Sequence, residues 1–360
     1  MAMIKGESYE SLFERIGERL RERVDKVKYD IVEDEKEELR NFFSFGIINQ
    51  EYQKAQELKQ NLLNNYKGTS LEEVIDGEEL KTKIGTCYHI KTQEKITVKR
   101  VNQTCARERI LSNLKLVYGI GEVTERILKN GGYKTIEDLR EHPRFGAEAA
   151  KFLAIDIHDT HSITEWIGHW LPKSHPLVLY SSSFQNEEDF IILDIETMGL
   201  SSLPIILCGT ARICGSQLVM NQYLLRDITE EPGALSAFLS HTDKGIFVTF
   251  NGKAFDIPYI KERLAYYGLQ GNLTNPHFDL LHFSRRAWKA QLPDCRLTTL
   301  EKHLFGIERE NDVPSALVPD FYDTYVKTGN VGPLIPIVEH NKQDMITLAN
   351  IFSRLHEEWE

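Results

Sequence analysis

The sequence predicts an α/β protein: a mixed sheet of five strands flanked by helices, preceded by a mainly helical N-terminal region. Two observations support this prediction. Up to about residue 70, apolar residues such as Leu12, Phe13 and Ile16 recur at helical spacing between charged ones. From about Leu177 onward, short apolar runs bounded by turn residues alternate with helical patterns, which is typical of a sheet covered by helices.

The C-terminal elements follow from their residues in order. DFIILDIE is an apolar strand that ends in carboxylates, and PIILCGTARICG and QLVMNQYLLR are two further strands joined by a tight turn at Gly215–Ser216. A helix over residues 232–239, the strand GIFVTFNG and a helix that opens at Phe255–Asp256 come next. The short strand HFDLL, a run of helices and a last helix from about Glu339 complete the region.

We predict four segments along the chain. They are a helical N-terminal region with a short strand pair (1–104), a helical hairpin domain (105–157), a linker (158–176) and the α/β domain (177–360). The strand pair is expected within residues 84–101, with a polar turn at Thr92–Lys95. Trp166 and Trp170 in the linker stand one helical turn apart, and they either pack a helix onto a domain or stack on nucleobases.

Composition excludes several classes of protein. The net charge of −11 excludes a protein that coats DNA through bulk basicity, and no G-x-x-x-x-G-K-[ST] motif supports a nucleotide-driven motor or kinase. The five cysteines form no C-x-x-C pair, which argues against a disulfide framework or a zinc ribbon. No stretch approaches the roughly 20 apolar residues that a membrane span needs, so we expect a cytoplasmic protein.

Two carboxylates end the first strand of the α/β region. Asp194 and Glu196 stand at positions i and i+2, so their side chains project from the same face of the strand. Neighbouring carboxylates on an apolar strand are costly unless a cation neutralises them, and a hard divalent ion suits oxygen ligands. A solvated acidic turn after the strand is the alternative.

Further candidates lie downstream. Asp256 opens a helix after the strand GIFVTF, where a carboxylate is either a helix N-cap or a ligand. His340 and Asp344 are four residues apart, so both lie on one face of the last helix. Taken alone, such a pair is more often a surface hydrogen bond than a catalytic pair.

In their order, these elements resemble the three sequence blocks of the DEDD exonucleases. DIETMGL is similar to the first block, NGKAFD to the second and H-x-x-x-D to the third. The resemblance is closest to the YprB-like ribonuclease H-like family, and it continues through HFDLLHFSRRAW, CRLTTLEKHLFGIERENDVP and HNKQDMITLANIF within residues 188–354. It implies a ribonuclease H-like fold for the five-stranded sheet.

The resemblance also implies a phosphodiester hydrolase that uses two Mg²⁺ or Mn²⁺ ions. In the family pattern, Asp194, Glu196, Asp256 and Asp344 hold ions about 3.5–4 Å apart. His340 would orient or deprotonate the attacking water. Three residues separate His340 from Asp344, where members of the superfamily that use His usually have four, so the role of His340 as the general base stays open.

Other residues near these blocks are candidates for nucleic-acid contact. Asn251 and Phe255 precede Asp256 closely. Arg285 and Arg286 follow the fifth strand, where they either hold phosphates or form a solvated helix face.

Upstream, KLVYGIGEVTERILKNGGYKTIEDL resembles a helix-hairpin-helix, a motif that contacts the DNA backbone without reading its sequence. Gly119 and Gly121 allow a tight turn that exposes backbone N–H groups at a helix N-terminus. Lys115 and Arg126 would add cationic contacts, and Ile120, Ile127 and Leu128 are expected to pack the two helices together. An ordinary αα-hairpin is the alternative.

The sequence therefore favours an exonuclease that acts on single-stranded DNA or DNA ends, and the resemblance implies the 3′–5′ type. The resemblance suggests DNA repair as the setting and a helicase as a candidate partner. An RNA-directed or structure-specific nuclease is one alternative, because the choice of sugar depends on contacts to the 2′-OH. A non-catalytic nucleic-acid-binding module is another, although all four carboxylates are present.

Overall fold

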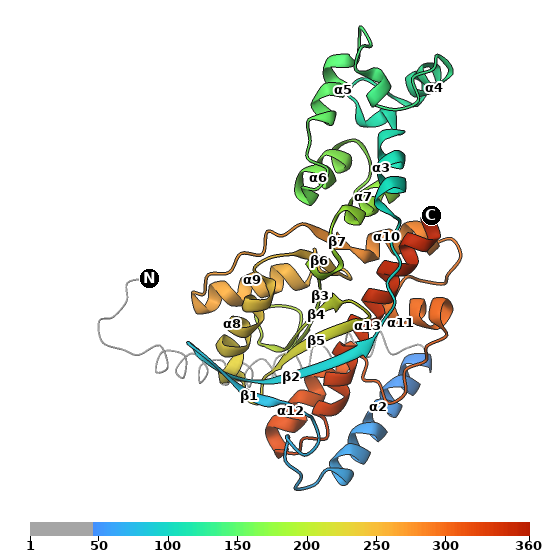
Figure 1. Cartoon of the computed structure of the whole chain (residues 1–360). Coiled ribbons are helices and arrows are strands. Elements are labelled where there is room, and N and C mark those ends of the chain that lie inside the picture. Colours follow the sequence, from blue (N-terminus) through green and yellow to red (C-terminus); the bar gives the residue numbers. More distant parts are fainter. Residues whose placement is uncertain (1–45) are drawn as a thin grey trace.

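The computed structural model describes residues 46–360 (Figure 1). The helices that the sequence predicts before residue 46 lie outside the described residues. Helix α2 (Gly46–Asn65) is joined to α12 (Val318–Thr328) by an ion pair of 2.5 Å between Lys59 Nζ and Asp320 Oδ2. All five cysteines are free, and none of the described helices is long and apolar enough to cross a membrane.

A mixed sheet of seven strands forms the centre of the described chain. Its spatial order is β1-β2-β5-β4-β3-β6-β7. Strands β1 to β5 pair antiparallel with their neighbours, whereas β6 and β7 continue parallel to β3. The strands are β1 (Glu78–Thr82), β2 (Gly85–Lys95), β3 (Phe190–Thr197), β4 (Ile205–Cys214), β5 (Gln217–Leu224), β6 (Ile246–Thr249) and β7 (His277–Asp279).

The mixed sheet is confirmed, but five is the wrong number of strands. Strands β1 and β2 come from the N-terminal region and join the sheet through the antiparallel pairing of β2 with β5. The expected turn at Thr92–Lys95 is also wrong, because Thr92 pairs with Met220 and Lys95 with Gln217 inside one long ladder. These polar residues alternate between exposed and half-buried positions, and β5 supplies their backbone hydrogen bonds.

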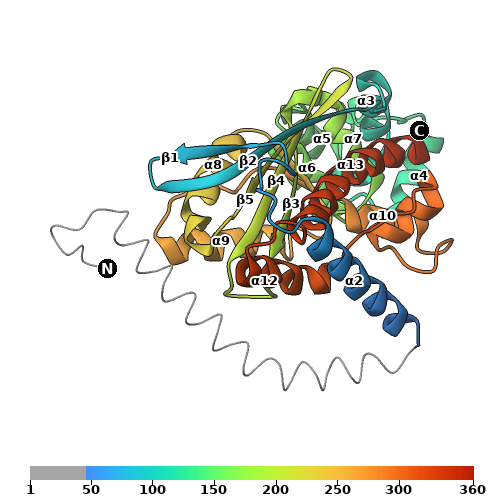
Figure 2. The ribbon, with the colours of Figure 1, turned by 90° about the horizontal axis from the view of Figure 1, so that it is seen from below.

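The two faces of the sheet are covered by different helices. The long helix α13 packs against β3, β4 and β5, while α8 packs against β2 and β4 and contacts α9. Figure 2 shows α13 beside α12 and α2. The helices of this part are α7 (Pro176–Tyr180), α8 (Glu231–Thr242), α9 (Asp256–Tyr267), α10 (Leu280–Trp288), α11 (Leu297–Leu300), α12 (Val318–Thr328) and α13 (Leu334–Trp359).

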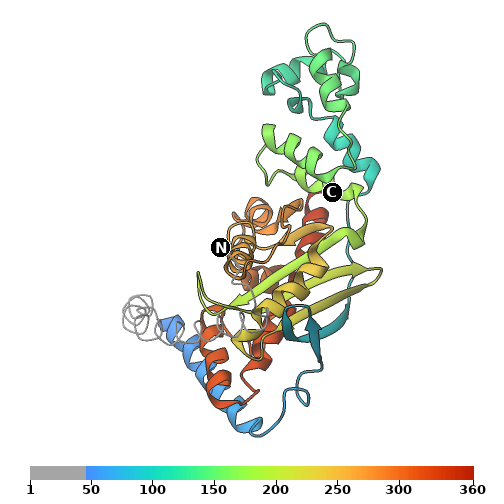
Figure 3. The ribbon, with the colours of Figure 1, turned by 90° about the vertical axis from the view of Figure 1, so that its left-hand side faces the viewer.

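A second unit, the hairpin unit (residues 103–170), stands out from the sheet (Figures 1 and 3). It comprises α3 (Gln103–Leu111), α4 (Glu122–Asn130), α5 (Gly146–Leu153) and α6 (Thr160–Trp170). Residues 158–176, expected as a linker, thus contain α6, whose Ile163 and Ile167 are buried. Both belong to one apolar cluster with Phe190 and Phe352 of the sheet region, so the two units share a core.

Candidate functional site

The first two carboxylates lie on the face of β3 that α13 covers. Along β3, Ile191, Leu193 and Ile195 pack into the apolar cluster that includes residues of α8 and α9. Because side chains alternate along a strand, Asp194 and Glu196 point to the opposite face. Glu196 is buried, and Asp194 is partly exposed.

Helix α13 is tied to β3 at this point by Asn341. Its amide nitrogen donates to the backbone oxygen of Asp194 at 3.1 Å and to Asp194 Oδ2 at 2.7 Å. Gln222 of β5 in turn donates to Asn341 Oδ1 at 3.0 Å. A Cβ atom at Gly209 of β4 would lie 2.3 Å from Asn341 Oδ1, so a glycine is needed for this close approach. Sequence reasoning missed Asn341, although it lies beside the expected His340.

Asp256 and Asp279 organise the other side of the site. Asp256 is the first residue of α9, it is buried, and it accepts backbone hydrogen bonds from its own N–H and from Ile195. Asp279 ends β7 and accepts from the backbone N–H groups of Asn251 at 2.8 Å and Lys253 at 3.1 Å. The buried Asp279 therefore fixes the loop that leads into Asp256.

The four predicted carboxylates act on one another electrostatically. Burial raises the pKa of Asp194 well above its usual range, and the charges of Asp344, Glu196 and Asp256 raise it further. The pKa of Glu196 is raised for the same reasons, and burial raises the pKa of Asp256 to about 7 in spite of its backbone hydrogen bonds. Burial also raises the pKa of Asp344. Three separate sequence segments thus bring mutually repelling carboxylates together, and we call Asp194, Glu196, Asp256 and Asp344 the carboxylate cluster.

His340 lies at the edge of the carboxylate cluster. Its Nε2 atom is 3.9 Å from Glu196 Oε1 and 3.8 Å from Asp344 Oδ2. Its Nδ1 atom lies 2.7 Å from Asp312 Oδ1. Burial lowers the pKa of His340, but the hydrogen bond to Asp312 and the charge of Asp344 outweigh burial and raise it overall. An Asp312 that accepts from Nδ1–H leaves Nε2 facing the cluster, which is the orientation a general base needs.

Arg309 is the counter-ion of this region, and sequence reasoning missed it as well. Its guanidinium forms two hydrogen bonds of 2.7 Å with Glu301 and also binds Asp344 Oδ1. Its Nη1 atom lies 3.6 Å from Asp312 Oδ2. The Arg309 side chain is 8% exposed and that of Glu301 is 0% exposed, so this ion pair is shielded from water.

The donor chemistry of the cluster fits a divalent cation. Its ligands are oxygen atoms only, they are anionic when ionised, and their mutual repulsion is relieved by a positive charge. Among residues 46–360, however, no group of three or more His, Cys, Asp or Glu side chains is arranged so that it could hold a metal ion as it stands. Arg309 binds Asp344 Oδ1 and Asn341 binds Asp194 Oδ2, two carboxylate oxygens that a metal would need.

Backbone strain is concentrated in the loops around the cluster. In the described part of the chain, the non-glycine residues with positive φ are Ser202, Asn251 and Asn311. Ser202 follows the β3 carboxylates, Asn251 precedes Asp256, and Asn311 adjoins Asp312. Such conformations cost free energy and persist where the surrounding structure enforces them, which is common at functional sites. Leu200, in the same loop as Ser202, is 88% exposed.

Comparison with known proteins agrees with this geometry. Residues 191–356 match the RNase_H superfamily. The protein "Uncharacterized protein YprB" of Bacillus subtilis (strain 168) is 34% identical over 186 residues, which cover 50% of this chain and 44% of that protein. The aligned part thus spans less than half of that relative's length.

After this match we call residues 191–356 the RNase_H superfamily domain. The superfamily is one of nucleases and phosphodiesterases that usually use divalent metals and bind nucleic acid, and all members of the carboxylate cluster lie within the matched residues.

The remaining predicted residues lie outside the cluster itself. Asn251 is exposed in the loop before α9, and the partly buried Phe255 packs on Tyr259 with ring centroids 5.4 Å apart. Arg285 and Arg286 are exposed on the last turn of α10.

In the hairpin unit, the segment 114–121 forms a tight turn before α4. Gly119 has φ +81°, which favours glycine, whereas Gly121 has φ −97° and precedes α4 as its N-cap residue. Lys115 is half-buried, and Arg126 is exposed on α4. Ile127 is 64% exposed, so the expected packing of this residue between helices is wrong.

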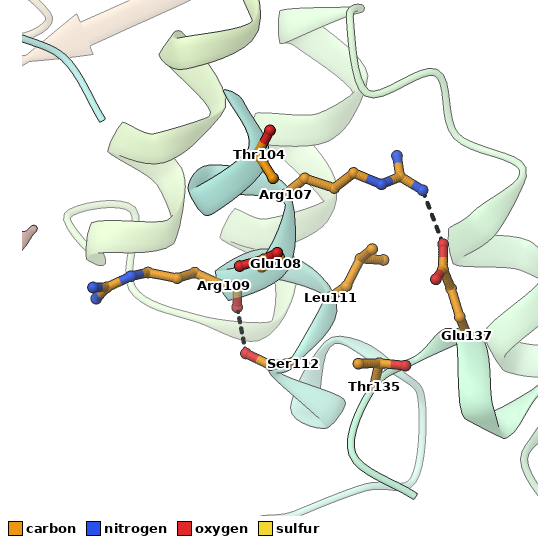
Figure 4. A pocket seen from close by; sticks show the side chains of 8 residues that line it. All are labelled: Thr104, Arg107, Glu108, Arg109, Leu111, Ser112, Thr135 and Glu137. Carbon is orange, nitrogen blue, oxygen red and sulfur yellow. Dashed lines mark hydrogen bonds and ion pairs between the residues drawn. The ribbon is translucent and has the colours of Figure 1, made fainter. Parts of the chain in front are cut away.

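Two cavities lie near these features. A cavity of about 480 Å³ in the hairpin unit is shown in Figure 4; its Arg107 is neutralised by Glu137 at 2.9 Å, and none of its lining residues belongs to the carboxylate cluster. A smaller cavity of about 300 Å³ is lined by Arg309, Asp312, His340 and Gln343, among others. No member of the carboxylate cluster lines the smaller cavity either, but its Arg309 and His340 both contact Asp344, so we assign it to the functional site.

Proposed function

We propose that the RNase_H superfamily domain is a metal-dependent exonuclease of the 3′–5′ type that hydrolyses phosphodiester bonds of DNA. The observation that supports this most strongly is the carboxylate cluster, in which side chains from β3, α9 and α13 raise one another's pKa values. A buried anionic cluster is costly without a cation. Divalent ions at such clusters supply a nucleophilic water and stabilise the charge of phosphoryl transfer.

Asp194, Glu196, Asp256 and Asp344 would hold two Mg²⁺ or Mn²⁺ ions. For this to happen, Arg309 has to release Asp344 Oδ1, and Asn341 has to release Asp194 Oδ2. His340 is proposed to accept a proton from the attacking water at Nε2, with Asp312 holding Nδ1. Because Asp312 also lies near Arg309, one loop sets both the imidazole orientation and the position of the competing cation.

The hairpin unit is proposed to contact the DNA backbone as a helix-hairpin-helix does. Support comes from the turn at Gly119, from the exposed N-terminus of α4 and from Arg126 on that helix. Glu125 does not oppose this role strongly, because its carboxylate accepts from Leu114 N–H at 3.0 Å and pairs with Lys129. DNA repair and a helicase partner remain part of the proposal through the family resemblance.

A cleavage assay tests the proposal. DNA and RNA oligonucleotides, single-stranded and duplex, are labelled at either end and incubated with Mg²⁺, Mn²⁺ or EDTA. We expect metal-dependent laddering of DNA, with the labelled end reporting the polarity. Laddering of RNA alone would instead support the RNA-directed alternative, and binding without cleavage in either metal would support a non-catalytic module.

Asp194→Asn is the decisive variant. It removes one charge from the cluster at nearly constant shape, so we expect hydrolysis to be lost while folding and nucleic-acid binding are retained. The control is Asp243→Asn, the same change at an exposed carboxylate at the end of α8. Full hydrolysis by Asp194→Asn would contradict the proposed mechanism.

A further inference from the structure

The hairpin unit meets the RNase_H superfamily domain at the loop over residues 171–175, between α6 and α7. On the hairpin side, Trp166 Nε1 of α6 donates to the backbone oxygen of Leu116 at 2.9 Å. On the other side, Arg286 Nε of α10 donates to Ser174 Oγ at 3.2 Å. The loop therefore connects the hairpin turn physically to the helix that follows β7.

Four cations gather along this junction, and we call them the basic seam: Lys115, Lys173, Lys253 and Arg286. Lys115 lies in the hairpin turn and Lys173 in the 171–175 loop. Lys253 lies in the loop before α9, and Arg286 lies on α10. Lys173, Lys253 and Arg286 are exposed, and Lys115 is half-buried. Among the residues that the structure describes, no carboxylate lies within ion-pair distance of any of the four.

Two pKa shifts reflect the positive charges of the seam, one at the neighbouring His175 and one at Lys253. Burial lowers the pKa of His175, and the charges of Arg286 and Lys115 lower it further. Desolvation by the surrounding protein atoms lowers the pKa of Lys253. The charge of Asp279 raises this pKa, and the charge of Lys173 lowers it further. Among the described residues no carboxylate forms an ion pair with these cations, so an anion that binds there does not have to displace an internal partner.

The seam leads from the hairpin to the carboxylate cluster. Lys115 lies four residues before Gly119, and Lys253 lies three residues before Asp256. Asp279 holds the backbone N–H of Lys253 at 3.1 Å, so this end of the seam lies in the fixed loop that leads into Asp256.

An aromatic pair accompanies the seam on the hairpin side. Tyr118 is 64% exposed, and its ring centroid lies 5.9 Å from that of Trp170, three residues before Lys173. Trp170 is partly buried, so Tyr118 is the exposed ring of the pair. An exposed aromatic ring beside cations is typical of surfaces that bind single-stranded nucleic acid, where a base stacks on the ring and the backbone follows the charges. A duplex keeps its bases stacked inside and gains nothing from such rings.

We infer that the basic seam binds the phosphodiester backbone of a single strand and carries it from the hairpin turn to the carboxylate cluster. This inference rests on the proposed function, whose substrate path it specifies. Lys173 and Lys253, which the sequence did not single out, are assigned to this path together with Lys115 and Arg286.

The test measures binding in EDTA, so that hydrolysis plays no part. Fluorescence anisotropy is recorded for labelled oligo-dT and oligo-U of about 16 nucleotides, and for a duplex of the same length, over a series of salt concentrations. The test variant is Lys173→Gln/Arg286→Gln. The matched control is Lys91→Gln/Lys95→Gln, which removes the same charge from exposed positions on β2, near the opposite edge of the sheet from β7.

For the test variant we expect single-strand binding to weaken about 10-fold at low salt, and the salt slope to fall by about 0.7 for each lost contact. The control should bind as the unmodified chain does. Photo-crosslinking of oligo-dT that carries 5-iodouracil should label the peptide with Tyr118 or Trp170 and gives a readout that does not depend on any variant's folding. DNA and RNA results together show which sugar the seam accepts.

Equal affinities and salt slopes for the test and control variants would overturn the inference, as would crosslinks confined to other segments. Tighter binding of the duplex than of the single strand would also overturn it. The outcome is separable from the proposed function. A chain that binds through the seam but never cleaves contradicts the nuclease alone, and an active nuclease whose binding ignores the seam contradicts the seam alone.

Discussion

Replacing Arg309 tests how the carboxylate cluster is held in the absence of metal. Arg309 binds Glu301 twice and Asp344 once, and its side chain is 8% exposed. Arg309→Met keeps most of the volume of the side chain and removes its charge and its hydrogen bonds. Two effects are expected. The variant should be less stable than the unmodified chain in the absence of metal, and it should bind a divalent metal more tightly.

The first effect is a loss of stability. Removing one partner from a buried ion pair leaves the other charge without compensation and costs about 3–5 kcal/mol. Glu301 is fully buried, so we expect the unfolding free energy of Arg309→Met in EDTA to fall by about that amount. The double variant Arg309→Met/Glu301→Gln should recover most of the loss, because an uncharged amide at this position is less costly to bury than an unpaired carboxylate.

The second effect is a gain in metal binding. In the unmodified chain a metal has to displace the Arg309 guanidinium from Asp344, whereas in Arg309→Met this oxygen is free. A ligand at 100 times its Kd stabilises the native state by about 2.7 kcal/mol. We therefore expect Mn²⁺ to raise the stability of Arg309→Met more than that of the unmodified chain at the same concentration.

Urea unfolding with and without Mn²⁺, together with calorimetric titration of Mn²⁺, measures both effects. The titration readout does not depend on catalysis. An equal Mn²⁺ stabilisation of both proteins would show that Arg309 does not compete for Asp344. If the unfolding free energy of Arg309→Met in EDTA fell by less than about 1 kcal/mol, water would screen the Arg309 ion pairs as it screens a surface pair.

Three further predictions follow from single positions. Gly119→Ser should destabilise the hairpin unit by about 1–2 kcal/mol, because Gly119 has a positive φ, and it should weaken binding of long DNA. Gly121 has a negative φ and open space around it, so Gly121→Ser should leave stability and binding nearly unchanged. Urea unfolding and fluorescence anisotropy measure the two quantities. Asp312→Asn should lower turnover about 100-fold with little change in KM, because His340 loses its orienting partner. The control is Glu310→Gln, at an exposed position in the same loop. A change in KM alone would contradict this role of Asp312. Burial lowers the pKa of His356 to about 3, so its neutral form stabilises the fold above about pH 6.5, and this contribution is lost as pH falls toward 3. Between pH 7 and pH 5 the loss should be about 2 kcal/mol, and His356→Gln should flatten the pH dependence of urea unfolding by that amount; an unchanged slope would contradict the assignment.

The central strands could be predicted because their local pattern specifies them. DFIILDIE and the two strands after it are apolar runs between turns, and the i, i+2 spacing alone places Asp194 and Glu196 on one face. The addition of β2 to the sheet could not be predicted in this way. Its partner β5 lies more than a hundred residues away, and no local pattern states which strand edge is open.

Arg309 and Asp312 were missed for a different physical reason. They lie in a loop without periodicity, and their function follows only from contacts with α13 and with Glu301. The error at Ile127 has yet another cause. Both Ile127 and Leu128 were expected to pack, but as neighbours they point about 100° apart on α4, and the structure buries Leu128 and exposes Ile127.

The separation of charge explains how an acidic chain can bind a polyanion. The carboxylate cluster gathers negative charge where a divalent ion would be bound, and Arg309 partly neutralises it until then. The basic seam gathers positive charge along the approach, outside ion-pair distance of any carboxylate among the described residues. Because 0.1 M salt limits the reach of surface charges to about 10 Å, a backbone on the seam is governed by the charges close to it rather than by the net charge of −11. Raising the salt concentration should therefore weaken binding at the seam while leaving a metal in the shielded cluster largely unaffected.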